Sequence, residues 1–304
     1  MVNNKKIFSI DLKIPIINFN TMVQSIKELR EICYKDSKGK RPLYMEWVTM
    51  TISIYVTKLL LYTPIGADQV TIGMVLLAVL GSVFMAFGTL KLMLVGILII
   101  HFTVILDNVN GEVARYRKEG SMTGTFLEQY YHELSVPLIF FSLGFGVFLA
   151  TGYKSVLIFG FLCAIFSRST VLSALKSAVV KNAIRDRKND KVDEKLKRYY
   201  SITGKSPNVD GGSTKTGAKL YRTYDFIREF WSAPFNIVHI NILILLEILN
   251  HHHLHLIPAY SMLYWYLVVY GSVSVLIQLI SFVVHYKGNT IYHYYVAMMG
   301  KNKK

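Results

Sequence analysis

The sequence predicts an all-α, polytopic membrane protein, with about six transmembrane helices and an N-terminal amphipathic helix in the membrane interface. Just over half of its 304 residues are hydrophobic (52%) and only 17% are charged, whereas a soluble domain carries about a quarter charged residues. The apolar residues fall in long blocks, and a spanning helix needs roughly 20 of them. Six blocks meet or approach that length: 70–87, 92–106, 126–150, 156–180, 235–249 and 260–284.

The net charge of +15 is distributed unevenly, and its distribution predicts the topology. With the N-terminus in the cytoplasm, the three outward connections hold only Lys91 and Lys154, and nearly all other Lys and Arg residues fall on inward segments. This is the positive-inside pattern. A basic inner face suits anionic headgroups. Because the cations flank membrane spans instead of forming one docking surface, membrane lipids are the expected partner and nucleic acid is not.

Three regions are predicted along the chain. Residues 1–45 form a polar, basic, cytoplasmic N-terminal region, 46–285 form the membrane domain, and 286–304 form a basic cytoplasmic tail. One long inward insertion, 181–231, interrupts the membrane domain. Its first part, 182–200, is expected to be a charged, solvated helix.

The segment 45–62 is apolar but contains Glu46 and Lys58. We expect it to lie in the plane of the interface, because a seventh span here would place the N-terminus outside, against the charge pattern. The two cysteines, Cys33 and Cys163, lie in different environments, so no structural disulfide is expected.

Polar and small residues recur at the inner end of the second block. Asp107, Asn110, Gly111 and Ala114 are spaced by three, four and seven residues, which places them on one face of a helix. A short loop with Arg115, Arg117 and Lys118 is expected to follow and to end at Gly124.

Glu128 and His132 lie four residues apart on the next predicted helix and face the same way. Polar residues at membrane depth are expensive and mark functional sites. Oxygen ligands from two helices suit Mg²⁺ or Mn²⁺ holding a pyrophosphate. An imidazole is suited to general-base chemistry near neutral pH.

This segment resembles the signature of CDP-alcohol phosphatidyltransferases, Asp-x2-Asp-Gly-x2-Ala-Arg-x8-Gly-x3-Asp-x3-Asp. Here it reads Asp107-x2-Asn110-Gly111-x2-Ala114-Arg115-x8-Gly124-x3-Glu128-x3-His132, so every spacing matches and five of the eight residues are identical. Upstream, Ala67-Asp68-Gln69-Val70-Thr71 resembles the Pro-Asn-Gln-Val-Thr element that often opens the first span of this family.

The resemblance implies a phospholipid-biosynthesis type of reaction, in which a phosphoalcohol such as phosphatidyl moves from a CDP-alcohol donor to an alcohol acceptor and CMP is released. It implies that Asp107, Asn110 and Glu128 hold Mg²⁺ or Mn²⁺, and that His132 deprotonates the acceptor. It also allows a homodimer, which is common in the family. The residues implied to border the cytidine nucleotide are Gly111, Ala114 and Arg115.

Arg168 lies near the middle of the fourth block. A cation at that depth is costly unless it is paired or hydrated. Two interpretations stay open: Arg168 binds a phosphate of the donor or acceptor, or it pairs structurally with a carboxylate or with backbone carbonyls.

The departures from the signature leave a second function open. The family's four aspartates are reduced to two carboxylates, Asp107 and Glu128. We therefore expect one tightly held metal, or a second that binds only with the substrate pyrophosphate. The alternative is a catalytically degenerate relative that binds lipid or nucleotide without turnover. A transporter is a weaker choice, because no internal repeat is visible.

Overall fold

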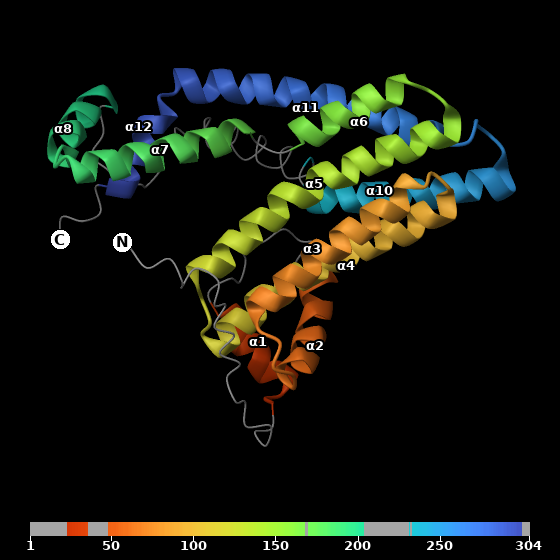
Figure 1. Cartoon of the computed structure of the whole chain (residues 1–304), viewed down its shortest axis with the longest axis horizontal. Helices are drawn as coiled ribbons and strands as arrows, with labels where there is room; N and C mark the ends of the chain where they lie inside the picture. Colours follow the sequence, from red (N-terminus) through yellow and green to blue (C-terminus); the bar gives the residue numbers. More distant parts are fainter. Residues whose placement is uncertain (1–22, 36–47, 168–169, 204–230, 232, 300–304) are drawn as a thin grey trace, which may run out of the picture. The chain divides into compact units, whose positions relative to one another are not determined.

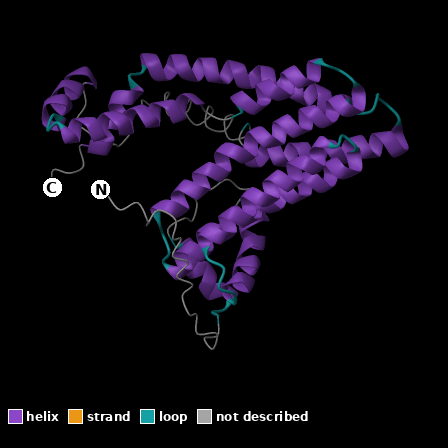
Figure 2. Cartoon of the chain, viewed as in Figure 1, coloured by secondary structure: helices purple, strands orange, loops and turns teal. Residues whose placement is uncertain are grey.

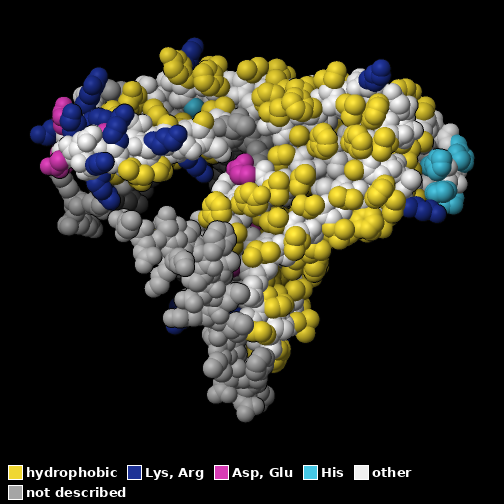
Figure 3. All heavy atoms as spheres, in the orientation of Figure 1, with side chains coloured by type: hydrophobic (Ala, Val, Ile, Leu, Met, Phe, Trp, Pro, Cys, Tyr) yellow, Lys and Arg dark blue, Asp and Glu magenta, His cyan; other side chains and the backbone are white. Residues whose placement is uncertain are grey.

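The computed structural model describes residues 23–35, 48–167, 170–203, 231 and 233–299, and within these ranges it contains helices and no strand (Figure 2). Six helical segments are long and apolar enough to cross a membrane, which confirms the predicted fold class. Hydrophobic side chains cover these helices, whereas Lys and Arg gather over α7 and α8 (Figure 3). The segments are α3 (Ala67–Ala86), α4 (Leu90–Arg117), α5 (Met122–Thr151), α6 with α7 (Ser155–Phe166 and Thr170–Lys188), α10 with η2 (Ala233–Leu249 and Asn250–Leu254) and α11 (Ser261–Lys287).

The helix α2 (Met50–Leu61) has 12 residues, too few to span a bilayer. One face is buried, with Ser53 and Thr57 fully enclosed, while Ile52, Tyr55 and Leu59 on the other face are exposed. The length and the exposed apolar face support the prediction of a helix in the interface.

The chain divides into two compact units, and α3, α4 and α5 contribute residues to both. The first unit comprises residues 1–78 and 101–132. In it, α1 (Ile26–Tyr34) packs against α2 (Figure 1). The helix α1 begins with a capping box, in which the Ser25 hydroxyl and the Glu28 carboxylate each satisfy a backbone N–H group of the first turn.

Two hydrophobic clusters stabilise this first unit. One joins α1 and α2 through residues such as Leu29 and Ile54, and the other joins α3, α4 and α5 through residues such as Met74, Val113 and Tyr131. The C-terminal end of α4 and the N-terminal end of α5, which carry the signature residues, are therefore held in one packed body.

The second unit comprises residues 79–100 and 133–304. In it α11 packs along α6, and α12 (Thr290–Met299) packs against α7 and α8 (Val192–Thr203) (Figure 1). The expectation of one solvated helix over 182–200 is wrong. The helix breaks at Asp190, whose φ is 54°, and Leu196 is buried against α7 and α12 because the apolar residues of α8 form a helical stripe.

Candidate active site

The signature residues occupy the C-terminal half of α4 and the first turns of α5. The helix α4 continues through Arg115 to Arg117, so the expected loop from Arg115 to Gly124 is shorter than predicted. Lys118 has a φ of 57°, and this left-handed residue ends the helix. Because α5 begins at Met122, Gly124 lies in its first turn.

Asp107, Glu128 and His132 come together across α4 and α5. Each offers one ligand atom, and these atoms all lie within 4.8 Å of one another. The Nε2 atom of His132 is 3.6 Å from the Oδ1 atom of Asp107, and the two side chains are 33% and 22% exposed. Among the described residues this is the one group of three or more Asp, Glu, His or Cys residues that could hold a metal.

The donor set fits a divalent cation. Ligand atoms bound at about 2.1 Å lie roughly 3 Å apart when adjacent and about 4.2 Å apart when opposite. Side-chain rotations that shorten the longest separation, 4.8 Å, by roughly 0.6 to 1.8 Å would therefore close the cluster around an ion. Asn110 follows Asp107 by one turn of α4 and is 8% exposed. Its role as a third oxygen ligand stays a prediction.

Gly111 makes room for the guanidinium of Arg115. A Cβ atom at position 111 would lie 3.1 Å from Nη1 and 3.3 Å from Nη2 of Arg115. The guanidinium of Arg115 therefore folds back over Gly111, one helical turn before it. This arrangement keeps a positive charge close to the face of α4 that carries Asp107.

Gly124 makes room for a carboxylate from another helix. A Cβ atom at position 124 would lie 2.9 Å from Oδ1 of Asp68, closer than two such atoms approach in proteins. Asp68 belongs to the upstream element in the first turn of α3. The structure thus brings that element to the first turn of the helix that carries Glu128, a proximity that spacing along the chain does not reveal.

Glu112 is a buried carboxylate that the signature does not include. It is fully buried and accepts hydrogen bonds from the hydroxyls of Tyr34 and Ser53 at 2.5 Å and of Thr57 at 2.6 Å. Burial, reinforced by the nearby Glu112 charge, raises the pKa of Tyr34, so this phenol remains a donor. The signal available in the sequence was a carboxylate in an apolar helix, on the face away from Asp107.

Two further contacts attach the C-terminal end of α4 to its neighbours. The Asn108 amide donates to the Thr49 hydroxyl at 3.0 Å. The guanidinium of Arg117 donates to the backbone carbonyls of Thr63 at 2.7 Å and Ile65 at 2.9 Å. The turn between α2 and α3 is therefore fixed to the last residue of α4.

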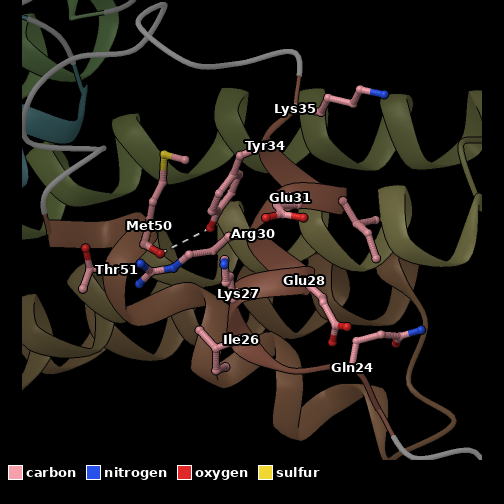
Figure 4. A pocket seen from close by; sticks show the side chains of 11 residues that line it. Gln24, Ile26, Lys27, Glu28, Arg30, Glu31, Tyr34, Lys35, Met50 and Thr51 are labelled. Carbon is pink, nitrogen blue, oxygen red and sulfur yellow. Dashed lines mark hydrogen bonds between the residues drawn. The ribbon is translucent and has the colours of Figure 1, made fainter.

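A groove of about 1230 Å³ runs along α1 in the first unit. Figure 4 shows Lys27 and Arg30 on the side of Met50 and Thr51. The hydroxyl oxygen of Tyr34 lies 3.2 Å from the Met50 carbonyl oxygen. None of the signature residues lines this groove.

The remaining predicted site residue, Arg168, lies outside the described residues. All the others, from Asp107 to His132, lie in the first unit.

Comparison with curated proteins finds no match. A family model, that of CDP-alcohol phosphatidyltransferases, matches residues 65–203, a range that contains both the signature and the Asp68 element. The spacing of the signature agrees with this match, and residues 65–203 are therefore similar to the CDP-alcohol phosphatidyltransferase family.

Proposed function

We propose that the protein is a divalent-metal-dependent phosphotransferase, which moves a phosphoalcohol from a CDP-alcohol to a second alcohol within the membrane and releases CMP. The observation that carries the proposal is the cluster of Asp107, Glu128 and His132, whose ligand atoms lie within 4.8 Å of one another. A family that uses CDP-alcohols supplies the substrate class.

In this proposal Asp107, Asn110 and Glu128 hold Mg²⁺ or Mn²⁺. The bound metal would neutralise the donor pyrophosphate and stabilise the charge that develops on it. The two carboxylates match the charge of one divalent cation, which supports a single resident metal. Arg115, whose guanidinium lies over Gly111, supplies a further positive charge for the donor phosphates.

His132 is the proposed general base. Its imidazole takes the proton of the acceptor hydroxyl while the acceptor oxygen bonds to the phosphorus nearest the alcohol of the donor. The bond between that phosphorus and the oxygen of CMP breaks, and CMP leaves with the electron pair. The half-exposed position of His132 supports this role, because an acceptor can approach its ring.

The catalytically degenerate alternative makes the opposite prediction for turnover. Detergent-purified full-length protein would be assayed for CMP release from a panel of CDP-alcohols and acceptor alcohols, with Mg²⁺ or Mn²⁺ and with chelator. We expect metal-dependent release that is lost in Asp107→Asn. The matched control is Asp190→Asn, an exposed aspartate in the second unit whose left-handed backbone tolerates asparagine.

Nucleotide or lipid binding without CMP release from any pair would favour the degenerate relative. Release that persists in Asp107→Asn would remove this cluster from the mechanism.

We also propose that the site faces the cytoplasm and that residues 46–285 form the membrane domain. The argument is the charge distribution, because Arg115, Arg117 and Lys118 lie at or just after the C-terminal end of α4, while its N-terminal end carries only Lys91. Labelling of a single cysteine placed at exposed Lys118 by a membrane-impermeant maleimide in intact cells tests this. Labelling before lysis would contradict the proposed orientation.

A further inference from the structure

The fully buried Glu112 is the strongest feature of the first unit that the proposed chemistry leaves unused. Its Oε1 atom accepts from Tyr34 of α1 and Ser53 of α2, and its Oε2 atom accepts from Thr57 of α2. The thiol of Cys33 also donates to the backbone carbonyl oxygen of Glu112 at 3.6 Å. One residue of α4 therefore gathers four contacts from the two N-terminal helices.

Stability alone is a weak reason for such a group. Removing a carboxylate from water is costly, and well-packed apolar residues in place of a buried charge are often neutral or stabilising. Three directional hydroxyl donors do something that apolar packing does not, because they fix the position of a helix in both rotation and translation. The arrangement indicates that the rotation and position of α4 are fixed at Glu112.

A fixed orientation of α4 matters because the proposed metal ligands lie on another face of the same helix turn. At about 100° per residue, Asn108 and Glu112 project together, and Asp107, Asn110 and Gly111 project to a different side. Asn108 is bonded to Thr49, just before α2, so both residues of the first face are tied to the N-terminal segment. Whatever fixes the rotation of this face also fixes the direction of the Asp107 carboxylate.

We propose that Glu112 is a positioning residue, through which the hydroxyls of Tyr34, Ser53 and Thr57 set the orientation of the metal-ligand face of α4. The inference rests on the proposed metal-dependent function. It assigns α1 and α2 a role in catalysis besides any contact they make with the membrane. Glu112 itself touches neither substrate nor metal.

The sharpest test compares two substitutions at Thr57. Thr57→Val keeps the shape and removes the hydroxyl, whereas Thr57→Ser keeps the hydroxyl and removes a methyl group. If the hydrogen bond positions α4, we expect kcat to fall by about tenfold in Thr57→Val, the size of effect seen for small misplacements of reacting groups, and by less than about twofold in Thr57→Ser. A packing role reverses this order, because serine leaves a cavity and valine does not.

A second readout does not depend on turnover. Mn²⁺ binding is measured by electron paramagnetic resonance on the same samples, and unfolding temperature is measured in parallel. We expect Thr57→Val and Glu112→Gln to weaken Mn²⁺ binding severalfold, and to lower kcat by a larger factor than they raise the KM for the CDP-alcohol. These measurements are made well below the unfolding temperature, so that loss of folded protein does not contribute.

The matched control is Tyr295→Phe in the second unit. Tyr295 is also buried and also donates to a buried carboxylate, that of Asp186, at 2.9 Å. We expect this variant to lose stability while keeping the wild-type kcat and Mn²⁺ affinity. Tyr34→Phe removes the corresponding hydrogen bond to Glu112, and we expect it to lower both kcat and the affinity for Mn²⁺.

Variants at positions 34, 57 and 112 that lose stability but keep wild-type Mn²⁺ affinity and kcat would overturn the positioning role and leave the proposed function intact. A wild-type protein that binds Mn²⁺ but releases no CMP would refute the proposed function, and the Mn²⁺ affinities would still decide whether Glu112 positions the ligands. A wild-type protein that binds no Mn²⁺ would overturn both.

Discussion

The Nε2 atom of His132 on α5 lies 3.6 Å from the Oδ1 atom of Asp107 on α4. The proposed general base is thus in direct electrostatic contact with a proposed metal ligand. At this distance the same imidazole suits two roles, because a neutral nitrogen beside a carboxylate takes up a proton or binds a metal. The two roles have different consequences for metal affinity.

Replacing His132 with glutamine separates these roles. If His132 is the base, we expect kcat to fall by about 10² to 10⁴, with Mn²⁺ affinity unchanged. If Mn²⁺ binding weakens in proportion to kcat, His132 is a ligand and the base must be sought elsewhere.

Metal binding should stabilise the folded protein. A ligand at a hundred times its dissociation constant adds about 2.7 kcal/mol to the free energy of unfolding, so we expect Mn²⁺ to raise the unfolding temperature of the wild type and chelator to reverse the shift. Asp107→Asn should abolish the shift, whereas Asp190→Asn should keep it. An equal shift in the two variants would place the stabilising ion outside the cluster.

A side chain at position 124 should displace the carboxylate of Asp68. A Cβ atom there would lie 2.9 Å from Oδ1 of Asp68, so we expect Gly124→Ala to rotate the flexible Asp68 side chain away from the first turn of α5 and to lower kcat. Gly73 is the control, because a Cβ atom at that helical position meets nothing within 4 Å. Gly73→Ala should leave kcat unchanged and stabilise α3 by about 0.5–1 kcal/mol. Equal activity of the two variants would contradict the tight contact at Gly124.

The thiol of Cys33 should be unreactive in the folded protein. Burial, with a smaller contribution from the Glu112 charge, raises its pKa to about 11, and the thiolate is the reactive form. In a Cys163→Ala background Cys33 is the one remaining thiol. At pH 8 we expect slow alkylation of the native protein by iodoacetamide and fast alkylation in denaturant. As the pH rises toward 11, the unfolded chain loses this proton before the folded one does, so the group should lower stability in that range. Rapid labelling of the native protein at pH 8 would show that α1 does not stay packed on α2.

Much of the fold follows from the sequence because a bilayer permits few backbone conformations. Every backbone polar group in hydrocarbon must be satisfied, so a long apolar block can only be a helix. The blocks 70–87 and 260–284, for example, correspond directly to α3 and α11. The spacing of Glu128 and His132 likewise placed both side chains on one face of a helix. Their proximity to Asp107 of α4 is a contact between two helices, and the role of Asn110 as a ligand stays a prediction.

Local helix ends were harder to predict, since they depend on single backbone conformations. The sequence suggested a loop from Arg115 to Gly124, but α4 continues to Arg117 and ends at Lys118, which has a left-handed conformation. Arg117 is therefore still helical, and its guanidinium donates to the Thr63 carbonyl in the turn before α3. The break at Asp190 and the packing of Leu196 against α7 and α12 were missed for a similar reason. The sequence of a charged segment does not show whether its few apolar residues pack against another helix, as Leu196 does here.

The sequence by itself determined that the chain has six long apolar helices and a segment that resembles the CDP-alcohol phosphatidyltransferase signature, because hydropathy and residue spacing are local properties of the chain. Only the tertiary structure decided that Asp68 fills the space left by Gly124 and that Tyr34, Ser53 and Thr57 converge on Glu112. Those contacts join residues 55 to 78 positions apart. No periodic pattern encodes such pairs; they form only when packing brings separate helices together.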